Sequence, residues 1–114
     1  MSELFLTTTD QVDAWRVRNY CGLVAGQAVY CQPFGAAFGT FGKAFSGGRV
    51  PELEKGLRTA KDQAVGSLSE EAAGLGANAV IGIRIDYETL GEGGMALMVC
   101  VSGTAVVLEP VAGS

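Results

Sequence analysis

The sequence predicts an α+β fold, a two-layer β-α-β-β subunit in which one long helix lies on an antiparallel-rich sheet. Three observations predict it. Residues 79–108 contain two runs that suit strands, joined by a turn at 90–94. Residues 51–75 instead carry apolar side chains at helical spacing. The second strand of the pair is apolar on both faces, so both of its faces must be covered.

The first part of the chain is expected to be an arm followed by a strand. Residues 1–14 are polar and rich in Thr, with a short strand at Leu4–Thr8. Trp15–Tyr30 follows as the first long strand. Within it, Gly22 and Gly26 indicate a bulge, a sharp bend or the close approach of another backbone.

A Gly-rich stretch, Cys31–Gly48, contains four phenylalanines at intervals of four, three and four residues. This spacing places all four rings on one face of a helix. Because glycines weaken a helix, we expect one or two helical turns here. The rings either form a contact surface between subunits or fill the core of one subunit. They are Phe34, Phe38, Phe41 and Phe45.

The main helix is predicted from Pro51, which suits a first helical position, to Gly76, which suits a left-handed C-cap. Some 24 residues would make it roughly 36 Å long. Small side chains at Gly56 and Gly66 leave room for a close neighbour. The predicted buried stripe consists of Leu53, Leu57, Ala60, Ala64, Leu68, Ala72 and Leu75.

The two final strands are predicted at Ala79–Thr89 and Met95–Leu108. The first alternates cleanly, with Ala79, Ile81, Ile83, Ile85 and Tyr87 on one face. The second is apolar on both faces, and a single helix covers only one face of a sheet. We therefore expect copies of the chain to cover each other, with Met98 in the contact.

The composition of the chain limits the classes of function that it can have. The chain has 114 residues, a net charge of −4, three Cys and no His. One domain is expected. Clustered Lys and Arg, which nucleic-acid binding needs, are lacking. The longest apolar run, Ala96–Val101, is far shorter than the ~20 residues of a membrane helix, and the start lacks the features of a signal peptide. We expect a cytoplasmic protein with no nucleic-acid or membrane partner.

One patch of the hairpin carries possible chemistry. If Tyr87 pairs with Leu97, Arg84 lies opposite Cys100 and Asp86 opposite Met98. The candidate metal ligands are therefore Cys100, Asp86, Glu88 and, if the first strand folds back, Cys21. Buried cysteines are more often small apolar packing residues. The pair Asp86 and Glu88 suits a solvated face, a channel lining or acid–base hydrolysis, and we assign no catalytic residue.

Three segments resemble a known family. The hairpin GANAVIGIRIDYETLG…MALMVCVSGTAV, the first-strand motif YCGLVAG and the helix start GGR…EKGLR resemble the YbjQ-like family of heavy-metal-binding proteins of uncharacterised function. The resemblance covers about residues 15–108 as a single domain, with 1–14 as an arm and 109–114 as a tail. It implies a dodecin-like subunit that assembles into a ring-shaped homopentamer.

The sequence departs from the family pattern at Gln27, where the family usually has Glu, which weakens an acidic site in the first strand. Dodecin stacks flavin on a strand Trp, but Trp15 lies at the beginning of its strand, so flavin is not expected here. Three hypotheses remain: a non-enzymatic homo-oligomeric binding module without a cofactor, a protein that binds a heavy metal ion through Cys and carboxylates, and a small hydrolase using Asp86 and Glu88.

Overall fold

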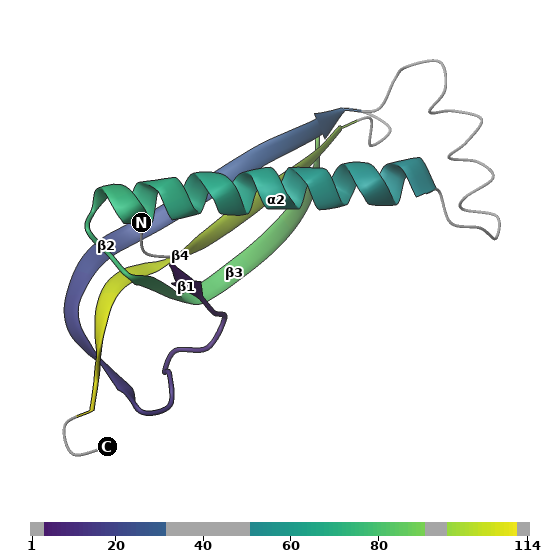
Figure 1. Cartoon of the computed structure of the whole chain (residues 1–114). Coiled ribbons are helices and arrows are strands. Elements are labelled where there is room, and N and C mark those ends of the chain that lie inside the picture. Colours follow the sequence, from purple (N-terminus) through teal and green to yellow (C-terminus); the bar gives the residue numbers. More distant parts are fainter. Residues whose placement is uncertain (1–3, 32–50, 91–95, 112–114) are drawn as a thin grey trace.

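The computed structural model of the chain describes residues 4–31, 51–90 and 96–111. One helix lies along one face of a curled sheet of four strands, which confirms the α+β prediction (Figure 1). The strand order is β1-β3-β4-β2, with β1 parallel to β3 and the other neighbours antiparallel. The elements are β1 (Phe5–Leu6), β2 (Trp15–Cys31), α2 (Pro51–Gly74), β3 (Ala79–Leu90) and β4 (Ala96–Pro110). The four phenylalanines of the Gly-rich stretch lie outside the described residues.

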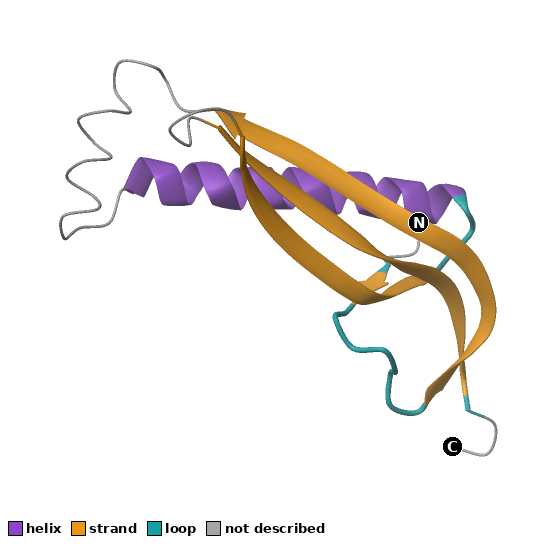
Figure 2. Cartoon of the chain, turned by 180° about the vertical axis from the view of Figure 1, so that it is seen from behind, coloured by secondary structure: helices purple, strands orange, loops and turns teal. Residues whose placement is uncertain are grey.

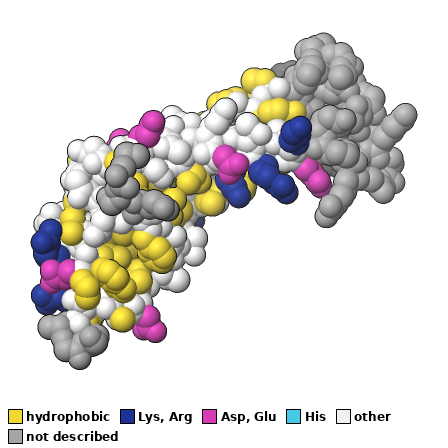
Figure 3. Space-filling view, in the orientation of Figure 1, with side chains coloured by type: hydrophobic (Ala, Val, Ile, Leu, Met, Phe, Trp, Pro, Cys, Tyr) yellow, Lys and Arg dark blue, Asp and Glu magenta, His cyan; other side chains and the backbone are white. Residues whose placement is uncertain are grey.

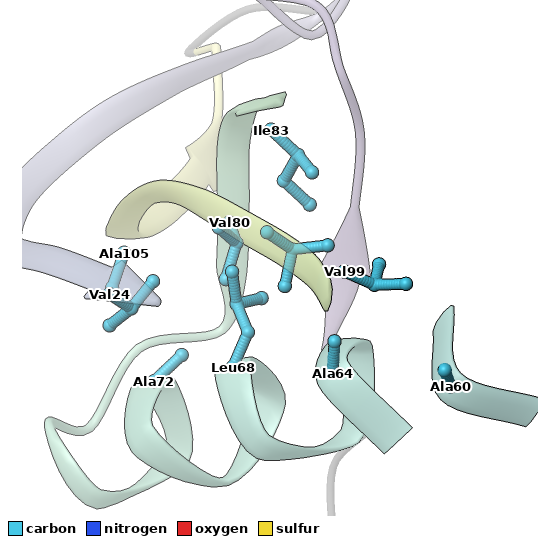
Figure 4. Close-up of a cluster of buried hydrophobic side chains, with 10 residues drawn as sticks. Val24, Ala60, Ala64, Leu68, Ala72, Val80, Ile83, Val99 and Ala105 are labelled. Atoms are coloured by element: carbon cyan, nitrogen blue, oxygen red, sulfur yellow. The ribbon is translucent and has the colours of Figure 1, made fainter. Parts of the chain in front are cut away.

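The main core lies between α2 and the sheet. Four helix residues spaced four apart are buried, and Leu68 points from α2 towards Val80 (Figure 4). The predicted stripe is thus confirmed in its central part. The prediction is wrong for Leu75, the last residue of the stripe. The helix α2 ends at Gly74, and Leu75 lies in the following turn, 47% exposed. The buried helix residues are Ala60, Ala64, Leu68 and Ala72. Leu57 is half-buried, and the side chain of Leu53 lies outside the described residues.

Two glycines mark places where α2 and β2 approach closely. A Cβ on Gly26 would lie 2.0 Å from the carbonyl oxygen of Ala64, so only glycine fits there. A Cβ on Gly56 would lie 2.3 Å from the ring of Tyr30. The expectation of a close neighbour is confirmed at both positions. It is wrong at Gly66, where an added Cβ would meet nothing within 4 Å.

The register of both long outer strands is irregular, at two places in β2 and at one in β3. In β2 the register shifts between Tyr20 and Gly22, and Gly22 has a φ of 134°, which confirms the irregularity predicted there. In β3 two residues, Gly82 and Ile83, lie opposite Gly103 alone, and Gly82 has a φ of 62°.

The β3 bulge reverses which face each later residue occupies. Val80 and Ile83 both belong to the core under α2, whereas Ala79 and Ile81 belong to a cluster on the opposite face. The prediction that Ala79 and Ile81 share a face with Ile83 is therefore wrong. An extra residue changes the parity of a strand by one, which no alternation pattern can show.

A second, smaller core lies on the sheet face away from α2. It contains Ala79, Ile81, Val106 and Leu108, against which Val12 and Val17 pack. The chain itself thus covers this end of β4, and the expectation that copies of the chain cover each other stays a prediction. At the opposite end of β4, Met98 and Cys100 are half-buried.

The hairpin register differs from the predicted one by two residues. Tyr87 pairs with Val99 instead of Leu97, and Arg84 pairs with Ser102 instead of Cys100. The ladder ends with Leu90 opposite Ala96, so the connection is two residues longer than the predicted pairing implies. The side chains keep their faces, because a shift of two preserves parity.

Candidate functional site

All but one of the residues singled out for chemistry lie on the part of the sheet that faces away from α2. We call this surface the outer face. Figure 2 views the molecule from this side, with the helix behind the sheet. The outer face comprises Leu23, Ala25, Gln27 and Val29 of β2, Met98, Cys100 and Ser102 of β4, and Arg84, Asp86 and Glu88 of β3.

Two neighbouring cross-strand rows contain most of the predicted site. Cys100 lies between Gln27 and Asp86, and its Sγ donates a hydrogen bond to Gln27 Oε1 at 3.9 Å. In the next row Met98 lies between Val29 and Glu88. The register therefore places Asp86 directly opposite Cys100, closer than the sequence predicted. Gln27 is the third member of the Cys100 row.

The structure does not bring Cys21 to this row. Cys21 packs against the core under α2, on the other side of the sheet. It is six residues from Gln27 along β2, which corresponds to about 20 Å. The described residues contain no group of three or more Cys, Asp or Glu side chains able to hold a metal ion.

The donors that the described residues of one subunit place in this row therefore do not fit a soft metal ion. Such an ion prefers four thiolate or imidazole ligands, and this row offers one thiol and one carboxylate. Asp86 and Glu88 are both exposed, and Arg84 lies one row away on the same face. An exposed carboxylate pair without a buried partner or a histidine is poorly equipped for acid–base chemistry.

The edges of the sheet carry exposed apolar side chains, an unusual feature that the titratable groups of the outer face do not offer. β2 forms one complete edge, where Glu71 Oε1 accepts a hydrogen bond from the Ala25 N–H at 2.9 Å. Two apolar residues of this strand are strongly exposed, Leu23 at 86% and Val29 at 51%. Sequence reasoning missed Leu23, because a strand pattern does not reveal which strand will lie at an edge.

β3 forms the opposite edge, and the N-terminal segment pairs with only part of it. Thr9 and Thr7 carbonyls accept hydrogen bonds from the N–H groups of Gly82 and Ile83. Beyond Ile83 no described residue pairs with this edge. Ile85 and Tyr87 lie there on the side of α2, but the helix covers mainly β2 and β4, and Tyr87 is 53% exposed. Tyr87 therefore lies on the helix side of the sheet without being buried in the core.

A hollow of about 830 Å³ lies at the other end of the molecule, and sequence reasoning missed it. Residues 10–15 form one side, and the first residues of β2 form another. Ile81 and Leu108 of the second core also line it. Its exposed aromatic residues are Trp15 and Tyr20.

Fold and site together define a class: a small α+β subunit with open sheet edges and, in the described residues, no assembled metal cluster. The chain belongs to the YbjQ family, described as "putative heavy-metal-binding", which residues 4–109 match. It is 42% identical over 106 residues to a "UPF0145 protein" of Acetivibrio thermocellus, covering 93% of this chain and all of that protein.

A solved structure has the same fold. It is a protein of unknown function of the DUF74 family from Pediococcus pentosaceus, with a TM-score of 0.63 and 16% identity. The similarity covers 93% of this chain and 98% of the other. In the part of the chain that the structure describes, no helix is both long and apolar enough to span a membrane.

Proposed function

We propose that the protein is a non-enzymatic, homo-oligomeric binding and assembly module of the cytoplasm. The observation that carries this proposal is the sheet with its two open edges, each bearing exposed apolar side chains. Long open edges invite pairing with another chain, and soluble proteins normally cover or interrupt them. Here Leu23 and Val29 on β2, and Ile85 and Tyr87 on β3, are exposed instead.

The direction of the strands favours a ring. β2 and β3 both run antiparallel to β4, so they run parallel to each other at opposite sides of one sheet. When the β2 edge of one copy meets the β3 edge of the next, every copy makes the same head-to-tail contact. Such contacts close into a ring when the rotation between copies allows it. A number of five comes only from what the sequence resemblance implies.

The outer face extends the proposed contact beyond the backbone edge. Val29 and Met98 lie in one row next to the open edge of β2. Both are apolar, and Met98 is only half-buried within one subunit. A neighbouring copy seated on this edge would remove them from water, which favours association by roughly 25 cal/mol for each Å² of apolar surface.

The non-enzymatic part of the proposal is supported by the placement of the polar groups. Asp86 and Glu88 are exposed on an open sheet face, and the chain has no His. Cys21, Cys31 and Cys100 are free thiols, in keeping with a reducing compartment.

The test is Met98→Glu, followed by light scattering coupled to size exclusion. A charge beside Glu88 in a desolvated contact is costly, and the cost recurs at every contact of an oligomer. We expect the variant to dissociate or aggregate. Gly66→Glu is the matched control, because it adds the same charge to α2 at a position where a side chain meets nothing within 4 Å. An oligomeric Met98→Glu variant of parental mass would contradict the proposed interface.

Metal binding is the second candidate, favoured by the pairing of Asp86 with Cys100 and by the family description. These two residues supply two donors, so a metal ion held here would need further ligands. The test is a titration with Cd²⁺ under reducing conditions. Stoichiometric uptake in the micromolar range that disappears in Cys100→Ser would support this candidate. We expect no such uptake, because the described donors fall short of a tetrahedral set.

A further inference from the structure

The hollow at the start of β2 combines an apolar floor with an acidic rim. Ile81 and Leu108 are each only 8% exposed and belong to the second core. Two aspartates, Asp10 and Asp13, line the same hollow and are exposed to water. Figure 3 shows hydrophobic side chains gathered at this end of the molecule, where β2 begins and β4 ends, with charged side chains beside them.

The charges of the hollow are unbalanced. Arg16 is the one basic residue that lines it, and its guanidinium is paired with Glu109, with Nε donating to Oε2 at 2.6 Å. Neither Asp10 nor Asp13 has an ion-pair partner among the described residues. The rim therefore presents two carboxylates whose charge no neighbouring cation neutralises, and such a rim attracts cations and repels anions.

The aromatic residues add a second element of recognition. Trp15 is 45% exposed and Tyr20 is 70% exposed, although both lie beside a buried apolar floor. The face of an indole or phenol ring attracts a cation, and its apolar body packs against hydrocarbon. Carboxylates and aromatic faces around an apolar floor suit one chemical class, a cation with an apolar body.

We propose that this hollow binds a small organic cation, an amine or quaternary ammonium group that carries an apolar or aromatic body. The ammonium group lies between the aspartates and the aromatic faces, and the body packs on Ile81 and Leu108. The proposal does not rest on the proposed assembly, because residues 10–17, Tyr20, Ile81 and Leu108 already form the hollow within one subunit.

Trp15 makes the proposal directly testable, because it is the only Trp of the chain and lies in the hollow itself. The probe is phenethylamine, titrated while the Trp15 fluorescence is recorded with excitation at the red edge of the indole band. The uncharged 2-phenylethanol and the anionic phenylacetate serve as matched probes of similar size. We expect saturable binding of phenethylamine in the millimolar range, about fivefold weaker binding of the alcohol, and none of phenylacetate.

The matched variants are Asp10→Asn with Asp13→Asn, and Asp62→Asn on the exposed side of α2 as the control. The double variant should bind phenethylamine about fivefold more weakly and bind the alcohol unchanged, which separates lost charge from lost fold. Asp62→Asn should bind like the parent.

Three results would overturn the proposal. The first is equal binding of amine and alcohol by the parent. The second is undiminished amine binding by the Asp10→Asn and Asp13→Asn double variant. The third is a shift of Trp15 fluorescence on dilution without any probe, which would assign the hollow to a second copy of the chain.

Discussion

At the scale of single residues, Asn78 shows how one side chain joins two elements. Its Nδ2 donates to the Leu108 carbonyl at 3.0 Å, and its Oδ1 accepts from the Leu108 N–H at 2.7 Å. Its own backbone N–H donates to the Val106 carbonyl. The amide thus imitates a strand neighbour for β4 just before β3 begins. This contact gives a physical reason for the polar residue in the GANAV motif.

Asn78→Ala leaves both backbone groups of Leu108 without these partners, and we expect it to lower the free energy of unfolding by about 1–3 kcal/mol. Urea denaturation measures the change. Asn19→Ala serves as the control, since Asn19 is exposed on β2 and its side chain makes only a 4.0 Å contact with Cys21. Equal denaturation midpoints for both variants would show that the Leu108 contacts add nothing.

Two glycines show which local features of the backbone could be predicted from the sequence and which could not. Gly26 interrupts a strand pattern, and such a glycine indicates that another part of the chain comes close to the strand. The backbone of α2 lies there. Gly82 stands in an alternation that looks unbroken, and nothing in that pattern indicates a positive φ. The face of every residue of β3 after Gly82 depends on that one bulge.

At the scale of elements, the helix and the strands follow from periodicity, and their ends and registers do not. The predicted buried stripe on α2 is confirmed from Ala60 to Ala72, because the spacing of apolar residues alone determines which side of a helix is buried. Leu75 continues the apolar spacing in the sequence, but it lies after the last residue of the helix. The hairpin register depends on the length of the turn, which the apolar pattern of the strands does not determine.

The contrast between Leu68 and Leu75 is a stability prediction. Leu68 is fully buried under the sheet, so Leu68→Ala should lower the free energy of unfolding by about 2–5 kcal/mol. Leu75 is half exposed, and Leu75→Ala should change it by no more than about 1 kcal/mol. Denaturant midpoints of both variants give the answer. Losses of similar size would mean that the core contains the helix end after all.

At the scale of the whole molecule, the class of fold could be predicted because one long amphipathic helix and alternating strands leave few arrangements. The site was predicted only in part. Asp86 and Glu88 share a face because they are two residues apart in β3, and Cys100 shares it because it pairs directly with Asp86. Cys21 is on the other side of the sheet, since its place depends on the curvature of β2 and its bulge.

The hollow could not be predicted for a different reason. Its walls come from residues 10–17, from Ile81 and from Leu108, which are far apart along the chain. Only the packing of the N-terminal segment against the second core brings them together. The same packing covers the apolar residues at the end of β4, which the sequence pattern alone assigned to a contact with another copy. Assembly is therefore expected from the open edges and from Val29 and Met98.

The most direct measurement is the molar mass of the unmodified protein in solution, by light scattering coupled to size exclusion from tens of micromolar downwards. A subunit has a mass of 11.8 kDa. The two exposed edges predict the mass of at least two subunits, and the homopentamer that the sequence resemblance implies predicts five times the subunit mass. A mass of a single subunit at tens of micromolar would contradict the assembly of this sheet into an oligomer.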